Sequence, residues 1–268
     1  AGGVYYTPQY IVEYIVKNTV GRLLGDTVVG SVGAALRGRP DLEMGQPGQP
    51  HRVAPTNAQT KNITPKNVST LRILDPACGS GSFLIGAYQH LLYWHLKWYR
   101  ENDPEKHAKG KTPAIYLGAG KEWRLTTQEK KRILLNNIYG VDIDRQAVEV
   151  TKLSLLLKLL EDENQETVGK TLALFQERVL PSLENNIKCG NSLIGPDFYS
   201  FQTLPFPNPT PPIPLFSKEG EPKAGAFEDA DIRRINVFDW GKEFPEIMKN
   251  GGFDAVIGNP PYVRQEML

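Results

Sequence analysis

The sequence predicts a doubly wound α/β fold built on a mainly parallel sheet. Short apolar runs typical of strands alternate with longer segments whose apolar residues recur at helical spacing. The chain has 268 residues and is 40% hydrophobic, which is enough for one sizeable core. Strands that alternate with helices favour parallel pairing, and such sheets carry their sites at the carboxyl ends of the strands.

The expected elements follow this alternation along the chain. Strands are predicted at 71–74, 138–143, within 186–192 and at 253–257, and helices at 8–24, 83–99, 126–136 and 144–160. Thr7 before Pro8 is typical of an N-cap with proline in the first turn, and Asp144 is expected to cap the last helix. The polar stretch 100–125 is expected to be irregular, and the basic run 130–132 to form a solvated helix face.

Composition excludes several classes of protein. No run of eighteen apolar residues and no signal pattern occurs, so the sequence predicts a soluble, cytoplasmic protein without membrane contact. Cys78 and Cys189 lie far apart and lack partners at metal-ligand spacing, so we expect two small buried residues, no metal and no disulfide framework. The net charge of +1 gives no global argument for nucleic acid binding.

A glycine-rich turn follows the first predicted strand. Between Asp75 and Gly81, the residues Ala77, Gly79 and Gly81 allow the backbone to approach a ligand, and the next helix offers free N–H groups. Such a turn alone fits a dinucleotide equally well. The carboxylate of Asp75 would repel a pyrophosphate and attract the ammonium and sulfonium of S-adenosylmethionine. We therefore expect S-adenosylmethionine as the cofactor.

Acidic residues also end the second predicted strand. Asp142 stands where a carboxylate accepts hydrogen bonds from a ribose diol, a feature shared by NAD and S-adenosylmethionine proteins. A purely structural role in the turn is the alternative for Asp142. The neighbouring Asp144 is assigned to helix capping instead.

The fourth predicted strand ends in Asn259-Pro260-Pro261-Tyr262. The prolines constrain the backbone, while the Asn259 amide oxygen and the Pro260 carbonyl oxygen form two converging acceptors. An amino group on an aromatic ring is a poor nucleophile, and two acceptors that grip its hydrogens favour its tetrahedral, nucleophilic form. Tyr262 would stack on a planar base extruded from a helix. Asn259, Pro260 and Tyr262 are therefore the catalytic candidates.

With these motifs, the chain resembles the amino-group DNA methyltransferases of the gamma arrangement, and among them the large methylases of type IIG restriction-modification and phage-defence systems. The opening Tyr5 to Pro8 is similar to the family's N-terminal motif, and Asp75 to Gly81, Tyr139 to Asp144 and Asn259 to Tyr262 are similar to its cofactor, ribose and catalytic motifs. The resemblance implies cofactor contacts from Thr7, Asp75, Ala77, Gly79, Gly81, Asp142, Ile143, Asn191, Ser192 and Pro261. Asn191 replaces the commoner aspartate, although its oxygen still accepts, and Ser192 is expected to assist.

The resemblance implies transfer of a methyl group to the N6 amino group of adenine in DNA. It also implies double-stranded DNA with a flipped adenine as the partner, and a restriction or specificity domain in the parent chain. Further strands and a target recognition domain would follow the catalytic motif, so we expect a sheet incomplete at its C-terminus, an exposed fourth strand and little activity from this chain alone.

The expected organisation divides the chain into five parts. These are an N-terminal helical segment with a cofactor motif (1–36), a flexible loop (37–66), a cofactor-binding α/β core (67–200), a proline-rich insertion (201–230) and the catalytic-motif strand and turn (231–268). Other acceptors remain open: N4 of cytosine, an RNA guanine amine or a protein glutamine amide. A non-catalytic cofactor-binding or DNA-binding subunit is a further alternative.

Overall fold

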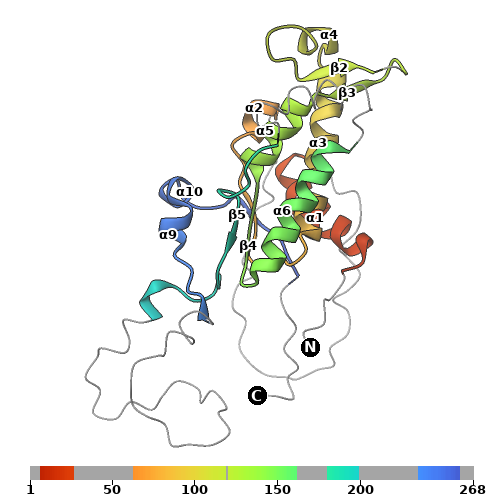
Figure 1. Cartoon of the computed structure of the whole chain (residues 1–268). Helices are drawn as coiled ribbons and strands as arrows, with labels where there is room; N and C mark the ends of the chain where they lie inside the picture. Colours follow the sequence, from red (N-terminus) through yellow and green to blue (C-terminus); the bar gives the residue numbers. More distant parts are fainter. Residues whose placement is uncertain (1–6, 27–62, 119, 162–179, 199–234, 260–268) are drawn as a thin grey trace, which may run out of the picture.

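A computed structural model describes residues 7–26, 63–118, 120–161, 180–198 and 235–259. Its centre is a four-stranded parallel sheet in the order β5-β4-β1-β6 (Figure 1). The strands are β1 (Ile73–Asp75), β4 (Ile138–Asp142), β5 (Ile187–Cys189) and β6 (Ala255–Val256). All four predicted strands are confirmed, and the parallel sheet agrees with the predicted fold class.

The register brings the ends of the predicted motifs to one edge of the sheet. Asp75 pairs with Gly140, and Asp142 pairs with Cys189. On the other side of β1, Leu74 pairs with Val256 of β6. The strand order therefore reverses at β1, and in open α/β sheets ligands bind outside the carboxyl ends at such a reversal.

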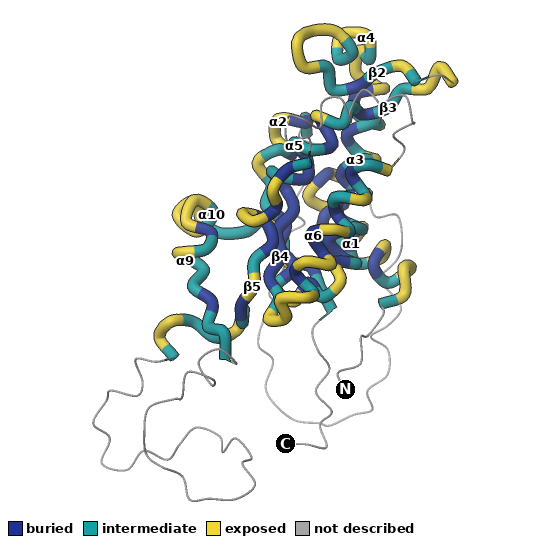
Figure 2. The backbone as a smooth tube through the Cα atoms, in the orientation of Figure 1, coloured by how far each residue is buried: buried dark blue, intermediate teal, exposed yellow. Residues whose placement is uncertain are grey.

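One face of the sheet is covered by the long helices. They are α1 (Gln9–Leu23), α3 (Ser82–Glu101), α5 (Thr127–Asn137) and α6 (Arg145–Leu160), which confirms the four helices predicted from spacing. Their apolar residues share one core with Ile73, Ile138 and Ile187 of the sheet. Figure 2 shows buried residues along β4 and along parts of these helices. No helix in these described ranges is long and apolar enough to span a bilayer.

The opposite face of the sheet carries a second, aromatic core. Leu74, Tyr139 and Val141 point to this side and pack with Phe238 and Phe244. Two short helices, α9 (Trp240–Glu243) and α10 (Pro245–Lys249), lie over it. Because alternate residues of a strand face opposite sides, neighbours such as Ile73 and Leu74 enter different cores, as a doubly wound sheet requires.

Helix α1 is held tightly against α3. Val12, Val16 and Val20 are buried, and a side-chain carbon at Gly86 would lie 2.5 Å from Val12, so glycine permits the close approach. The predicted N-cap role of Thr7 is wrong: Pro8 occupies the cap position, and no side chain caps the helix. The Thr7 hydroxyl bonds elsewhere.

The predicted irregular stretch 100–125 is wrong. It contains α4 (Pro104–His107) and an antiparallel hairpin of β2 (Ile115–Leu117) and β3 (Trp123–Leu125). Each strand has three residues, too few for an alternating pattern to emerge from a polar background. Burial of Ile115 and Leu125 fixes the hairpin to the main core.

Two polarity predictions are also wrong. Lys130 on the supposedly solvated face of α5 is only 9% exposed, because its ammonium donates to the carbonyl of Glu161 at 2.8 Å. Cys78 is buried as expected, but Cys189 is exposed. Sequence pattern alone does not reveal that the end of α6 covers Lys130, or that the last residue of β5 lies open.

The predicted loops fall largely outside the described residues. This holds for most of 37–66 and for all of 201–230. The end of the first loop is helical, since α2 (Pro65–Val68) begins there with a capping box between Thr64 and Asn67. Pro260, Pro261 and Tyr262 of the catalytic motif also lie outside the described residues.

Candidate methyl-transfer site

The glycine turn between β1 and α3 is shaped by the chain itself. Gly79 and Gly81 have φ of +53° and +84°, values that residues with side chains rarely adopt. The Thr151 hydroxyl of α6 donates to the Gly79 carbonyl at 2.7 Å, and a side-chain carbon at Gly81 would lie 2.9 Å from Thr151. At Gly81, glycine is therefore required both by the backbone conformation and by the close packing against Thr151.

Asp75 is a buried carboxyl group at the centre of this edge. The residue is 1% exposed, and one oxygen accepts from the Ala77 N–H at 3.1 Å. The pKa of Asp75 is raised to about 7, chiefly by burial; the Ala77 hydrogen bond opposes this rise and the nearby Asp142 adds to it. In the described part of the chain Asp75 has no ion-pair partner. A cationic ligand would relieve this cost.

Asp142 closes the other side of the glycine turn. One carboxylate oxygen accepts from the Gly79 N–H at 2.7 Å, and the other accepts from the Asp144 N–H at 2.9 Å. Asp144 caps α6 by accepting from the Gln146 N–H at 2.8 Å, as predicted. Ile143 between them is 52% exposed, unusual for an isoleucine that follows a buried strand. Each Asp142 oxygen keeps a second lone pair for a ligand.

Asn191 and Ser192 lie after β5, on the far side of β4 from Asp75. The Asn191 amide oxygen accepts from the Leu193 N–H at 3.2 Å, and the Ser192 carbonyl accepts from the Trp240 indole at 3.2 Å. The segment forms a parallel bridge to Val237. These two residues are thus at the predicted edge but nearer to Asp142 than to β6, which suits the outer part of an elongated ligand.

Asn259 lies where the last described strand leaves the sheet, beside Asp75. Gly258 packs so closely that a side-chain carbon there would lie 2.9 Å from an Asp75 oxygen. The Asn259 amide nitrogen donates to the Thr7 hydroxyl at 3.3 Å, joining residues 252 positions apart. The structure therefore brings together Thr7, Asp75 and the start of the catalytic motif, as the sequence predicted.

Two structural contributors were not predicted from the sequence. Thr151 supports the glycine turn from α6, and Gly258 lets the end of β6 pass over Asp75. No sequence signal marks Thr151, which is one more residue on an amphipathic helix. Gly258 could have been found, because a glycine directly before the motif is typical of a close backbone approach.

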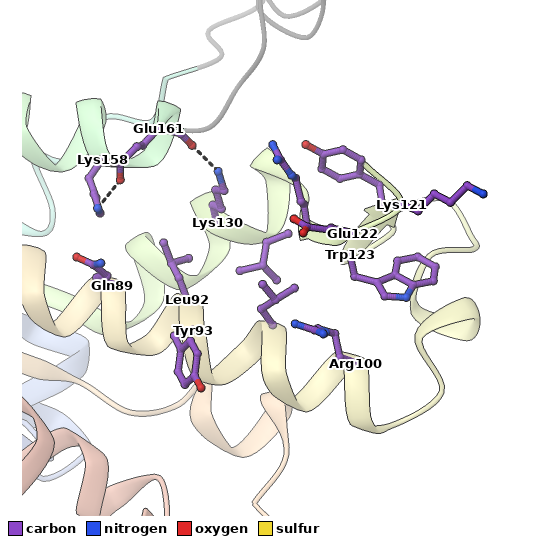
Figure 3. A pocket seen from close by; sticks show the side chains of 14 residues that line it. Gln89, Leu92, Tyr93, Arg100, Lys121, Glu122, Trp123, Lys130, Lys158 and Glu161 are labelled. Carbon is purple, nitrogen blue, oxygen red and sulfur yellow. Dashed lines mark hydrogen bonds and ion pairs between the residues drawn. The ribbon is translucent and has the colours of Figure 1, made fainter. Parts of the chain in front are cut away.

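A cavity among the described residues lies elsewhere. It measures about 550 Å³ and is lined by Tyr93 and Arg100 of α3, Trp123 of the hairpin, and Lys158 and Glu161 of α6 (Figure 3). The lining residues of α3 and α6 lie toward the C-terminal ends of these helices, which run antiparallel to the strands. The cavity therefore lies at the amino end of the sheet, away from Asp75 and Asn259, and is not the predicted site.

Comparison with known families covers both halves of the chain. The family described as MmeI, DNA-methyltransferase domain, matches residues 53–200, and the Eco57I restriction-modification methylase family matches residues 136–268. The first match spans the glycine turn and Asp142, and the second spans Asp142 and Asn259.

Several curated proteins are similar over much of the chain. The type II restriction enzyme and methyltransferase RM.Eco57I of Escherichia coli is 28% identical over 265 residues, which are 99% of this chain and 18% of that protein. The putative type II restriction enzyme and methyltransferase RM.MjaORFECS2P of Methanocaldococcus jannaschii is 34% identical over 198 residues, 72% of this chain and 14% of that protein. The adenine-specific methyltransferase BrxX of Escherichia coli is 31% identical over 162 residues, 60% of this chain and 11% of that protein.

The chain thus spans less than a fifth of the length of these relatives. Within that span lie the glycine turn, the acidic end of β4 and the asparagine after β6, at one edge of a parallel sheet. The match to the MmeI domain covers more than half of the chain. The chain therefore belongs to the family of the MmeI DNA-methyltransferase domain.

Proposed function

We propose that the chain is the catalytic part of an enzyme that transfers a methyl group from S-adenosylmethionine to the N6 amino group of adenine in DNA. The observation that carries the proposal is the position of Asn259. It follows Gly258, which packs on the buried Asp75, and it lies at the reversal of strand order where such sheets bind ligands.

The described residues fit the proposed cofactor. Gly79 and Gly81 adopt left-handed conformations before α3, and among the described residues Asp75 is a buried carboxyl group without an ion-pair partner. When bound, S-adenosylmethionine supplies an electrophilic methyl group on a positively charged sulfur. Asp75 and Ala77 would hold its methionine end and Asp142 its ribose. Ile143, Asn191, Ser192 and Pro261 would complete the remaining contacts.

Asn259 would act on the acceptor. Its amide nitrogen is already engaged with Thr7, so its amide oxygen is the atom left to accept a hydrogen from an amine. With the proposed second acceptor at the Pro260 carbonyl, the amine nitrogen keeps its lone pair for the methyl group. Tyr262 would stack on the base. No strong base is needed, because the amine proton leaves after transfer.

The names of the relatives favour adenine in DNA over the other possible amino-group acceptors. Adenine is named for BrxX of Escherichia coli and for PglX of Streptomyces coelicolor and Lacticaseibacillus casei. We therefore propose double-stranded DNA with a flipped adenine as the substrate. A role in restriction-modification or phage defence, with a restriction or specificity domain in the same protein, and the cytoplasmic location stay predictions.

The test compares Asn259→Ala with Asn250→Ala in the full protein. Asn250 ends α10 and is an exposed asparagine outside the site. We expect Asn259→Ala to lower methyl transfer roughly 100- to 1,000-fold, the effect of removing one acceptor that acts on the transition state, with cofactor affinity unchanged. Asn250→Ala should leave both unchanged. Mass analysis of nucleosides identifies the product, and any product other than N6-methyladenine contradicts the proposed acceptor.

A further inference from the structure

The Thr7 hydroxyl is an unexpected partner for Asn259. A threonine before the first turn of a helix ordinarily caps it, yet no side chain caps α1, and Pro8 takes the cap position. The hydroxyl instead accepts from the Asn259 amide nitrogen at 3.3 Å. The family resemblance assigns Thr7 to the cofactor, and this contact connects it directly to the proposed catalytic motif.

The contact matters because a carboxamide has two ends of nearly equal shape and opposite chemistry. Only the oxygen accepts a hydrogen from an amine, whereas the NH₂ end would meet the amine hydrogens with hydrogens of its own. When the nitrogen of Asn259 is bonded to Thr7, the oxygen is turned to the other side. Rotation of the amide by half a turn would turn the NH₂ end toward the amine, and the Thr7 hydroxyl would then donate to the Asn259 oxygen instead of accepting from its nitrogen.

Both partners of this hydrogen bond are anchored on different parts of the fold. Thr7 precedes α1, which is fixed on α3 by its buried valines and by the close approach at Gly86. Asn259 follows β6, whose end is fixed by the contact of Gly258 with Asp75 and by the bond from the Ile257 N–H to the Leu74 carbonyl at 2.8 Å. A site supported from two rigid elements holds its geometry.

We propose that Thr7 is a positioning residue that holds the Asn259 amide with its oxygen toward the target amine. The inference rests on the proposed methyl transfer and adds a role to a residue otherwise assigned to the cofactor. A positioning role and a cofactor role make different predictions. Loss of positioning slows the transfer step, whereas loss of a cofactor contact weakens cofactor binding.

The experiment compares Thr7→Val with Thr7→Ser in the full protein. Valine keeps the shape of threonine without the hydroxyl, and serine keeps the hydroxyl. Thr19→Val is the matched control, because Thr19 lies on the same helix and its hydroxyl bonds only to backbone carbonyls of α1 in the described structure. Single-turnover methyl transfer to DNA and calorimetric cofactor binding are measured for each variant.

We expect Thr7→Val to slow single-turnover transfer roughly tenfold, the usual effect of one hydrogen bond, with cofactor affinity changed less than about twofold. Thr7→Ser should recover most of the rate, and Thr19→Val should match the wild type. An unchanged rate for Thr7→Val overturns the inference, as does a rate loss that follows weaker cofactor binding. Absence of transfer by the wild type would instead overturn the proposed function.

Discussion

A buried carboxyl group lies near each end of α3, one without a cationic partner in the described residues and one paired with an arginine. At the start of α3, Asp75 is 1% exposed, and the described residues give its carboxyl group one backbone N–H and the like-charged Asp142 as neighbours. Near its end, Glu129 of α5 is 7% exposed and accepts two hydrogen bonds from Arg132 and one from Tyr99. Burial acts to raise the pKa of Glu129, but these bonds outweigh it and lower the pKa below its usual value.

The difference separates a carboxylate that is neutralised within the fold from one that is not, as expected of a proposed binding site. A buried carboxylate that only supports the fold is neutralised within the chain, because an unpaired buried charge is costly. Asp75 lacks such a partner among the described residues and lies at the edge where the ligand is expected. Strongly perturbed groups of this kind gather at functional sites. The comparison therefore points to the start of α3 as the ligand-binding end.

The largest expected effect is on the pH dependence of stability. Burial lowers the pKa of His95 from 6.5 to about 4, so stability is lost as the pH falls through that interval, where only the unfolded chain binds the proton. Burial raises the pKa of Asp75 from 3.8 to about 7, so stability is lost as the pH rises, where only the folded chain holds the proton. In the wild type, the contributions of His95 and Asp75 to the pH dependence of the unfolding free energy therefore have opposite signs.

Removing one of the two groups should reveal the contribution of the other. The unfolding free energy is measured with urea at a series of pH values. His95→Phe removes the opposing contribution of His95 and should show a fall of about 3 kcal/mol in unfolding free energy from pH 4 to 7. Asp75→Asn leaves His95 alone and should show a rise of about 3 kcal/mol from pH 4 to 6.5. A wild-type profile as steep as either variant would contradict the opposition.

The next largest effect concerns the ion pair between Glu129 and Arg132, near the end of α3. Arg132→Met leaves Glu129 buried without its cation, and we expect a loss of about 2–3 kcal/mol, less than for a fully buried pair because Arg132 is 33% exposed. Lys131→Met on the same helix should change stability by less than about 0.5 kcal/mol. Adding Glu129→Gln to Arg132→Met should recover part of the loss. If it does not, the charge of Glu129 is not the cause.

A smaller effect tests the glycine turn at the ligand-binding end. Gly81→Ala forces a side chain into a left-handed conformation and against Thr151, and should cost about 2 kcal/mol. Gly79→Ala has a similar conformation but open space and should cost about 1 kcal/mol. Thermal unfolding measures both. Equal losses would mean that the contact with Thr151 contributes nothing.

The smallest effect is expected for Thr151→Val, which removes the hydrogen bond to the Gly79 carbonyl and should cost about 1 kcal/mol. If the unsupported turn holds the proposed cofactor, S-adenosylmethionine, less well, its affinity should fall by up to about tenfold. Calorimetry measures this affinity. An unchanged affinity would limit Thr151 to a role in folding.

Local pattern was enough to predict the sheet, the long helices and the order of the motifs. Apolar residues repeat at a characteristic spacing in strands and helices of ordinary length. Ile138 to Asp142 and Arg145 to Leu160 could therefore be recognised from their own sequence, without knowledge of the segments that pack against them. The cap at Asp144 was predicted for the same reason, since capping involves only residues close in sequence. The hairpin 115–125 was missed because its strands are too short to show a period.

The sequence by itself determined which residues could do the chemistry: a glycine turn after Asp75, a carboxylate at Asp142 and an amide at Asn259. Only the tertiary structure decided how they are used. It left Asp75 without a charged partner in the described residues, paired Glu129 with Arg132, and joined the Thr7 hydroxyl to Asn259 instead of to its own helix. Desolvation and hydrogen bonds between residues distant in sequence depend on how the elements pack, and no local pattern records them.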